Sequence, residues 1–149
     1  MKNIILIFAL APFVIGCQSN SAPRTPIGDV LPAGVEPLAG MNMHYECVLY
    51  FDQTKNEDGV TQSIDAAVTI GEHQGMSPTR MMNVYRGIRE EQEARVLAES
   101  ISIAENRKNL IPRISGGPPS PTREEQLKAW EGLYGEKCNS LYDFNTATT

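Results

Sequence analysis

The sequence predicts an α+β fold in which a small antiparallel sheet is covered by helices. Two runs alternate apolar and polar residues with a period of two, and two later segments repeat apolar residues every three or four positions. A chain of 149 residues is long enough for one domain. We expect that domain to span residues 41–144 and to be followed by a polar tail, 145–149.

The predicted sheet begins with a β-hairpin. In "HYECVLYF" (44–51) every second residue is apolar, whereas His44 and Glu46 face the other way. "VTQSIDAAVTI" (60–70) alternates in the same manner, and the polar segment between the runs ends in Gly59. This pattern is typical of two half-buried strands, so we expect a hairpin 44–51/60–70 with a long, solvated tip.

The next segment, residues 76–88, is compatible with two structures. Ser77 followed by Pro78 is a plausible helix start. The apolar residues within 80–86 also suit a third strand. A strand is the preferred interpretation because it would extend the sheet.

Two helices are expected to pack on the sheet. Residues 89–107 carry acids early and bases late, which suits the helix dipole, and their apolar residues fall on one face. A capping-box pattern between Thr122 and Glu125 predicts the start of the second helix, 123–134, which we expect to end near Gly135. A connector rich in Pro and Gly separates the two helices.

The N-terminus has the composition of a secretory signal peptide. Residues 1–16, "MKNIILIFALAPFVIG", combine the positive charge of Lys2 with an apolar core. That core is shorter than the roughly 20 apolar residues that a membrane-spanning helix needs. We therefore expect residues 1–16 to be removed.

The end of this segment, Val14-Ile15-Gly16-Cys17, resembles the lipobox of bacterial lipoproteins. The resemblance implies that the Cys17 thiol is lipidated and that a dedicated signal peptidase cleaves between Gly16 and Cys17. In lipoproteins an aspartate after the cysteine favours the inner membrane. Gln18 stands there in this chain, which implies an anchor in the outer membrane facing the periplasm.

Residues 17–40 are predicted to be a tether. They contain four prolines and three glycines and show neither a helical nor a strand period. The tether would let the domain stand off the membrane and reach a partner.

The cysteine count predicts one disulfide. With Cys17 lipidated, Cys47 and Cys138 remain, and an even pair in an oxidising compartment is expected to bond. Two free thiols, or pairing with a partner protein, are the alternatives.

The composition argues against nucleic-acid and metal binding. The net charge is −5 and the basic residues are scattered. His44 and Cys47 have a spacing that metal sites use, with His73 and Cys138 as conceivable partners. Because Cys47 is expected in the disulfide, we predict no metal site.

No catalytic motif is present, and the sequence predicts neither enzymatic activity nor a cofactor. The acids Glu90, Glu91 and Glu93 are more typical of a solvated first turn of a helix than of paired catalytic carboxylates. Five aromatic residues are candidates for lining a glycan or peptide groove, although at strand and helix spacing they are more typical of a core: Tyr45, Tyr50, Tyr85, Trp130 and Tyr134.

The layout is also similar to that of periplasmic membrane-bound inhibitors of C-type lysozyme. The shared features are a lipobox, a linker, the early "YEC" (45–47) and the late Cys138. The resemblance implies a small β-barrel whose inhibitory loop carries a Ser-Gly motif, here Ser115-Gly116. The helical pattern of residues 89–107 departs from such a barrel.

Two functions from different classes follow. The first is an accessory module of an envelope complex in secretion, conjugation or surface assembly, docking a protein partner by a free sheet edge or by "GPPSP" (117–121). The second is a binder or inhibitor of a periplasmic or host enzyme, inserting residues 52–59 or 115–121. An envelope hydrolase ranks last.

Overall fold

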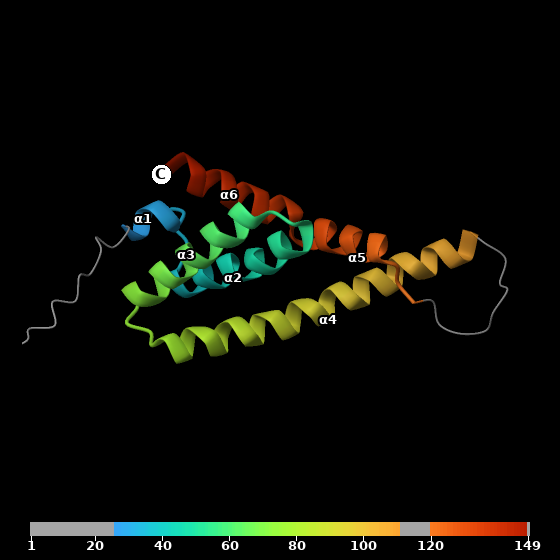
Figure 1. Ribbon diagram of the computed structural model, residues 1–149, viewed down its shortest axis with the longest axis horizontal. Helices are drawn as coiled ribbons and strands as arrows, with labels where there is room; N and C mark the ends of the chain where they lie inside the picture. The colour runs from blue at the N-terminus through green and yellow to red at the C-terminus, as the bar shows by residue number, and fades with distance from the viewer. Residues whose placement is uncertain (1–25, 111–119, 149) are drawn as a thin grey trace, which may run out of the picture.

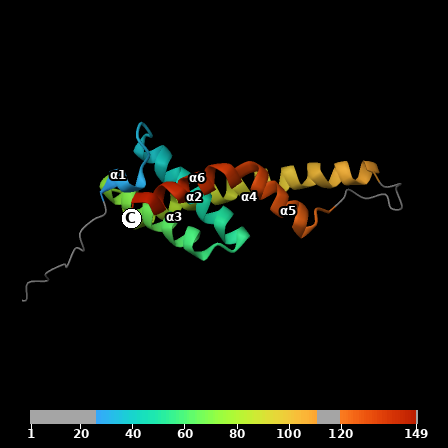
Figure 2. The ribbon, with the colours of Figure 1, turned by 90° about the horizontal axis from the view of Figure 1, so that it is seen from above.

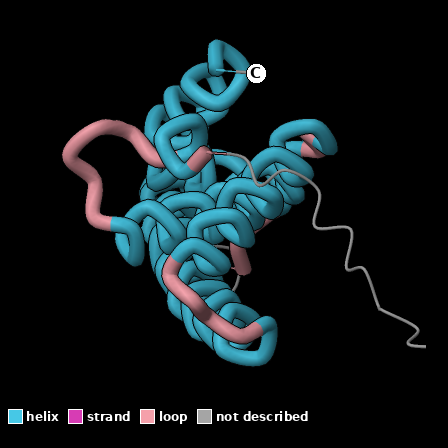
Figure 3. The backbone as a smooth tube through the Cα atoms, turned by 90° about the vertical axis from the view of Figure 1, so that its left-hand side faces the viewer, coloured by secondary structure: helices cyan, strands magenta, loops and turns pink. Residues whose placement is uncertain are grey.

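The structure, a computed structural model, describes residues 26–110 and 120–148 and is all-α over these ranges (Figure 1). Figure 3 shows only helices and loops there, so the predicted α+β fold is wrong. The predicted signal peptide 1–16, Cys17 and the first part of the tether lie outside the described residues. The helices are α1 (Ile27–Val30), α2 (Pro37–Thr54), α3 (Glu57–His73), α4 (Pro78–Leu110), α5 (Arg123–Trp130), the π-helix η1 (Glu131–Gly135) and α6 (Glu136–Thr148).

The first predicted strand, 44–51, lies inside α2, which is the central helix of the bundle. Helices α3, α4, α5, η1 and α6 all pack against it. A helix with neighbours on several sides is apolar nearly all round and shows no single stripe. Because α2 is covered on several sides, eight of its residues alternate in polarity without forming a strand, and the period-two criterion gave the wrong prediction here.

The second predicted strand, 60–70, lies inside α3, which packs antiparallel to α2. The residues of α3 that face α2 are mostly small, so the two backbones approach closely. A Cβ on Gly59 would lie only 2.6 Å from the ring of Phe51. The larger side chains of this segment alternate along the sequence, so the helical spacing of the small, buried residues was not recognised. The buried residues of α3 are Gly59, Ser63, Ala66, Ala67, Ile70 and Gly71.

A tight turn joins α2 to α3 where we expected a long hairpin tip. Lys55 adopts the left-handed conformation, with φ 64°. Asn56 caps α3, because its side-chain oxygen accepts a hydrogen bond from the Gly59 N–H at 2.9 Å.

The segment 76–88, for which the sequence allowed a helix or a strand, belongs largely to α4. Residues 80–86 are helical, so the predicted third strand is wrong. The Ser77 hydroxyl accepts a hydrogen bond from the Arg80 N–H at 3.3 Å, and Pro78 is the first helical residue. The predicted helix 89–107 is confirmed as part of α4, whose 33 residues span about 50 Å. Its C-terminal turns project beyond α5 (Figures 1 and 2).

The capping box that begins α5 is confirmed. The Thr122 N–H donates to the Glu125 carboxylate at 2.8 Å, and the Glu125 N–H donates to the Thr122 hydroxyl at 3.3 Å. The expected stop near Gly135 is wrong, because α5 continues through η1 into α6. The π-turn is held to α2 by the Tyr50 hydroxyl, which donates to the Glu131 carboxylate at 2.6 Å.

The predicted disulfide between Cys47 and Cys138 is confirmed, with 5.2 Å between the two Cα atoms. It joins the middle of α2 to the first turn of α6. Both cysteines are fully buried, in a cluster that includes Phe51, Trp130 and Tyr134. The bond therefore closes the core around the central helix.

Residues 26–40, which we expected to belong to the tether, form α1, a short connection and the start of α2. The His44 ring, fully buried, donates from Nε2 to the Val30 carbonyl oxygen at 2.7 Å. Burial lowers the pKa of His44 below its ordinary value of 6.5. Leu31 packs against Gly40, so α1 is fastened to the end of the bundle where α3 joins α4.

Candidate functional site

The main surface feature is a groove between α3 and α4, floored by α2. It consists of two adjoining hollows of about 510 Å³ and about 360 Å³. Both are lined by Val48, Ile64 and Tyr85, so one continues into the other. We call the whole feature the α3–α4 groove.

The two walls of the groove are ridges of helix side chains. Residues three or four apart lie on one face of a helix, and such rows are the surfaces by which helices pack. The α3 wall consists of Val60, Ile64, Val68 and Glu72. The α4 wall consists of Pro78, Met81, Met82, Tyr85, Arg89, Glu93, Val96, Leu97 and Ser100.

Exposed large apolar side chains gather on these walls. Ile64 is 42% exposed, Met82 55% and Leu97 52%. Away from the groove, Leu38 and Leu133 are the other large apolar residues with comparable exposure in the described ranges. Clustered exposure of this kind marks interaction sites, whereas scattered single residues are normal.

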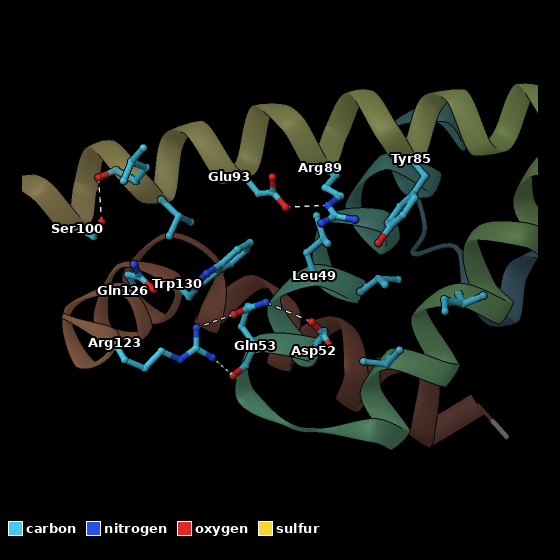
Figure 4. A pocket seen from close by; sticks show the side chains of 15 residues that line it. Leu49, Asp52, Gln53, Tyr85, Arg89, Glu93, Ser100, Arg123, Gln126 and Trp130 are labelled. Carbon is cyan, nitrogen blue, oxygen red and sulfur yellow. Dashed lines mark hydrogen bonds and ion pairs between the residues drawn. The ribbon is translucent and has the colours of Figure 1, made fainter. Parts of the chain in front are cut away.

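The larger hollow is lined by polar and apolar side chains in similar measure and lies between α2, α3, α4 and α5 (Figure 4). On α4, Arg89 pairs with Glu93 at 2.7 Å, and this hydrogen bond raises the pKa of Arg89. From α5, Arg123 donates to the Gln53 side-chain oxygen at 2.8 Å and to its backbone oxygen at 3.2 Å. Asp52 lies close enough to Arg89 for its charge to raise the same pKa further.

The smaller hollow is apolar and lies toward the turn between α3 and α4. Its lining includes Tyr45, Val68 and Met82, and Glu72 is its one charged side chain. The rings of Tyr45 and Tyr85 lie 5.4 Å apart between centroids, and burial raises the pKa of both hydroxyls. The groove thus changes along its length from mixed polarity to apolar.

The disulfide residues predicted from the sequence lie in the core and not in the groove. Because Cys47 and Cys138 are bonded to each other, neither is a metal ligand with His44 or His73. Over residues 26–110 and 120–148, no group of three or more His, Cys, Asp and Glu side chains is arranged to hold a metal ion.

The other candidates are distributed as follows. Of the helix acids, Glu91 pairs with Arg95 on the exposed side of α4, and Glu93 faces the groove. The lipobox with Gly16 and Cys17, and Ser115-Gly116, lie outside the described residues. Residues 44–51 and 60–70 are helical, so the predicted sheet edge is absent from the part of the chain that the structure describes. Among the aromatic residues, Tyr45, Tyr85 and Trp130 line the groove, and Tyr50 and Tyr134 belong to the core.

Sequence reasoning missed the groove itself. Its key side chains Ile64 and Leu97 were placed on apolar faces that we expected to be covered. The sequence holds no signal for it, because Ile64 and Leu97 are residue types that ordinarily fill a core.

Comparison with known proteins adds no relative, because no family model, no curated protein and no solved structure matches this chain. Among the helices that the structure describes, none combines the length and apolarity required to cross a membrane.

Proposed function

We propose that this protein is a lipid-anchored, non-catalytic interaction module that holds a protein partner at the periplasmic face of the bacterial outer membrane. The partner would belong to an envelope complex of the secretion, conjugation or surface-assembly kind. The docking surface in this proposal is the α3–α4 groove.

The observation that carries the docking part is the concentration of exposed apolar side chains along the groove. Ile64 projects from α3, while Met82 and Leu97 project from α4, and all three line the hollows between these helices. A groove between two helices, with an apolar half and a half of mixed polarity, suits the mode in which a partner helix is laid into it.

The anchoring part rests on the lipobox resemblance of Val14-Ile15-Gly16-Cys17. Nine residues, Cys17 to Thr25, precede the described domain, and even fully extended they span at most about 32 Å. A partner in the groove would therefore be kept close to the membrane.

The alternative function, a binder or inhibitor of the lysozyme-inhibitor kind, has less support. The resemblance implied a small β-barrel, and residues 26–110 and 120–148 form helices without a strand. An envelope hydrolase has the least support, because Glu93 in the groove is paired with Arg89 rather than with a second carboxylate.

The docking proposal is tested by crosslinking intact envelopes and purifying the tagged protein with its partner. Ile64→Asp is expected to abolish the complex because it places a charge on the apolar wall. Leu133→Asp is the matched control, since Leu133 is 41% exposed and lies outside the groove. A complex that survives Ile64→Asp, or that both variants lose equally, would contradict the proposal. Circular dichroism confirms that both variants are folded.

The anchoring proposal is tested by Cys17→Ala. This variant has no thiol to lipidate, so it is expected to leave the membrane fraction. Membrane retention of the Cys17→Ala protein would show that the anchor is not the Cys17 lipid.

A further inference from the structure

The smaller, apolar hollow has the size and lining to take one aromatic group. Its volume of about 360 Å³ is more than twice the roughly 150 Å³ of a cavity that binds benzene, so a two-ring aromatic group fits. The hollow is lined by the rings of Tyr45 and Tyr85 and by the side chains of Met81 and Met82. Thioethers make favourable contacts with aromatic rings, and methionine adapts its shape to what it binds.

The charge of this hollow is not cancelled by a base. Glu72 is its one charged side chain and forms no ion pair with any described residue. The next residue, His73, is exposed and does not line the hollow. The larger hollow differs, because two bases and two acids line it together. A ligand in the apolar hollow therefore meets a single negative charge.

The position of Glu72 in its helix is unfavourable for an acid. It lies in the last turn of α3, Glu57–His73. The carboxyl-terminal end of a helix is negative, so it disfavours an acid and favours a cation. No ion pair with a described residue offsets this cost. Departures from a local rule without such an offset are expected at functional positions.

From these observations we infer that the apolar hollow is the anchor pocket of the docking surface and takes an aromatic side chain of the partner that has a cationic group beside it. The ring would lie against Tyr45, Tyr85 and the two methionines, and the cation would pair with Glu72 at the end of α3. Aromatic side chains seated in pockets carry much of the binding energy of protein interfaces. This inference rests on the proposed function and names the partner's chemistry at one point of the groove.

Three indole derivatives of similar size serve as probes. Tryptamine carries a cation, indole-3-ethanol is neutral and indole-3-propionate carries an anion. Each is titrated into the mature protein, residues 17–149 with Cys17→Ala, and backbone amide shifts are followed by NMR. Tryptamine is expected to bind with a dissociation constant of about 2 mM, as its number of atoms suggests. The neutral probe is expected to bind about threefold more weakly and the anion more weakly still, since an exposed ion pair has a small effect that salt screens.

Glu72→Gln is the decisive variant, because it removes the charge and keeps the size of the side chain. The three probes are expected to bind this variant equally. Asp65→Asn is the matched control, since Asp65 is an exposed acid of α3 that does not line the groove, and it keeps the preference for the cation. Val68→Phe fills the hollow from its α3 wall and is expected to abolish binding of all three probes. The urea midpoint of Glu72→Gln is expected to stay at or above that of the parent protein, because the replaced acid has no ion pair and opposes the helix dipole.

The outcomes separate this inference from the proposed function. Equal binding of the three probes by the parent protein, or an unchanged preference in Glu72→Gln, overturns the cation site. Absence of saturable shifts up to about 20 mM, ten times the expected constant, or binding that survives Val68→Phe, overturns the aromatic pocket. A lower urea midpoint of Glu72→Gln would show that Glu72 serves the fold and would also overturn the cation site. The proposed function fails on a different result, a complex in envelopes that survives Ile64→Asp.

Discussion

Removing the Cys47–Cys138 disulfide tests how far the fold depends on fastening α6 to α2. The perturbation is the double variant Cys47→Ala, Cys138→Ala, made in a Cys17→Ala background so that no free thiol remains. The closed loop contains 92 residues, because the sequence separation is 91 and both ends count. In the chain-entropy model a loop of this length contributes about 4.6 kcal/mol to the free energy of unfolding.

Two further effects of the substitution are small by comparison. Both cysteines are fully buried, so replacing each sulfur by hydrogen removes some packing in the cluster around Trp130. Residual structure in the unfolded chain works in the opposite direction and reduces the entropic contribution. The expected loss is about 3–5 kcal/mol, a large fraction of the stability of an ordinary domain.

Urea unfolding followed by circular dichroism measures the effect. The double variant is expected to unfold at lower urea with a larger m-value, since the uncrosslinked unfolded chain exposes more surface. A loss below about 1 kcal/mol with an unchanged m-value would refute the reasoning, because it would mean that the bond does not constrain the unfolded chain.

Four other substitutions test three individual features of the fold. Gly59→Ala is expected to cost about 1–3 kcal/mol in urea unfolding because its Cβ would meet the Phe51 ring, whereas Gly87→Ala, with open space, is expected to gain up to about 1 kcal/mol. Equal effects would contradict the close α2–α3 contact. His44 is buried with a lowered pKa, so the unfolded chain takes up its proton first and stability falls as pH drops below 6.5. His44→Gln is expected to reduce that slope, and an unchanged slope would exclude His44 as its source. Thr122→Ala is expected to lower the unfolding free energy by about 1 kcal/mol through loss of the α5 cap; no loss would contradict the capping role.

The features that the sequence predicted correctly depend on local chemistry or on simple pairing. The capping box of Thr122 and Glu125 is a four-residue interaction that depends only on the sequence at the start of the helix. The disulfide followed from the count of cysteines once Cys17 was assigned to the anchor. Neither prediction required knowledge of the tertiary contacts of these residues.

The predictions that failed depend on the neighbours of each helix. The alternation in 44–51 arises because α2 is covered on several sides, and that in 60–70 because α3 meets α2 through small residues such as Ala66 and Ala67. A window of about eight residues does not distinguish these cases from strands.

The groove depends on how three helices, α2, α3 and α4, pack together. It forms because α2 separates α3 from α4, so that Ile64 and Leu97 face a gap and not each other. Their types are those of ordinary core residues, and their exposure emerges only when the three helices are placed together.

Photo-crosslinking in living cells tests the central claim, that the α3–α4 groove is the docking surface, most directly. A photoreactive amino acid replaces Leu97 on the groove wall or, as a control of nearly equal exposure, Leu38 away from it (52% and 55% exposed). The account predicts a crosslinked protein partner at Leu97 and none at Leu38. A partner captured at Leu38 and not at Leu97 would contradict it.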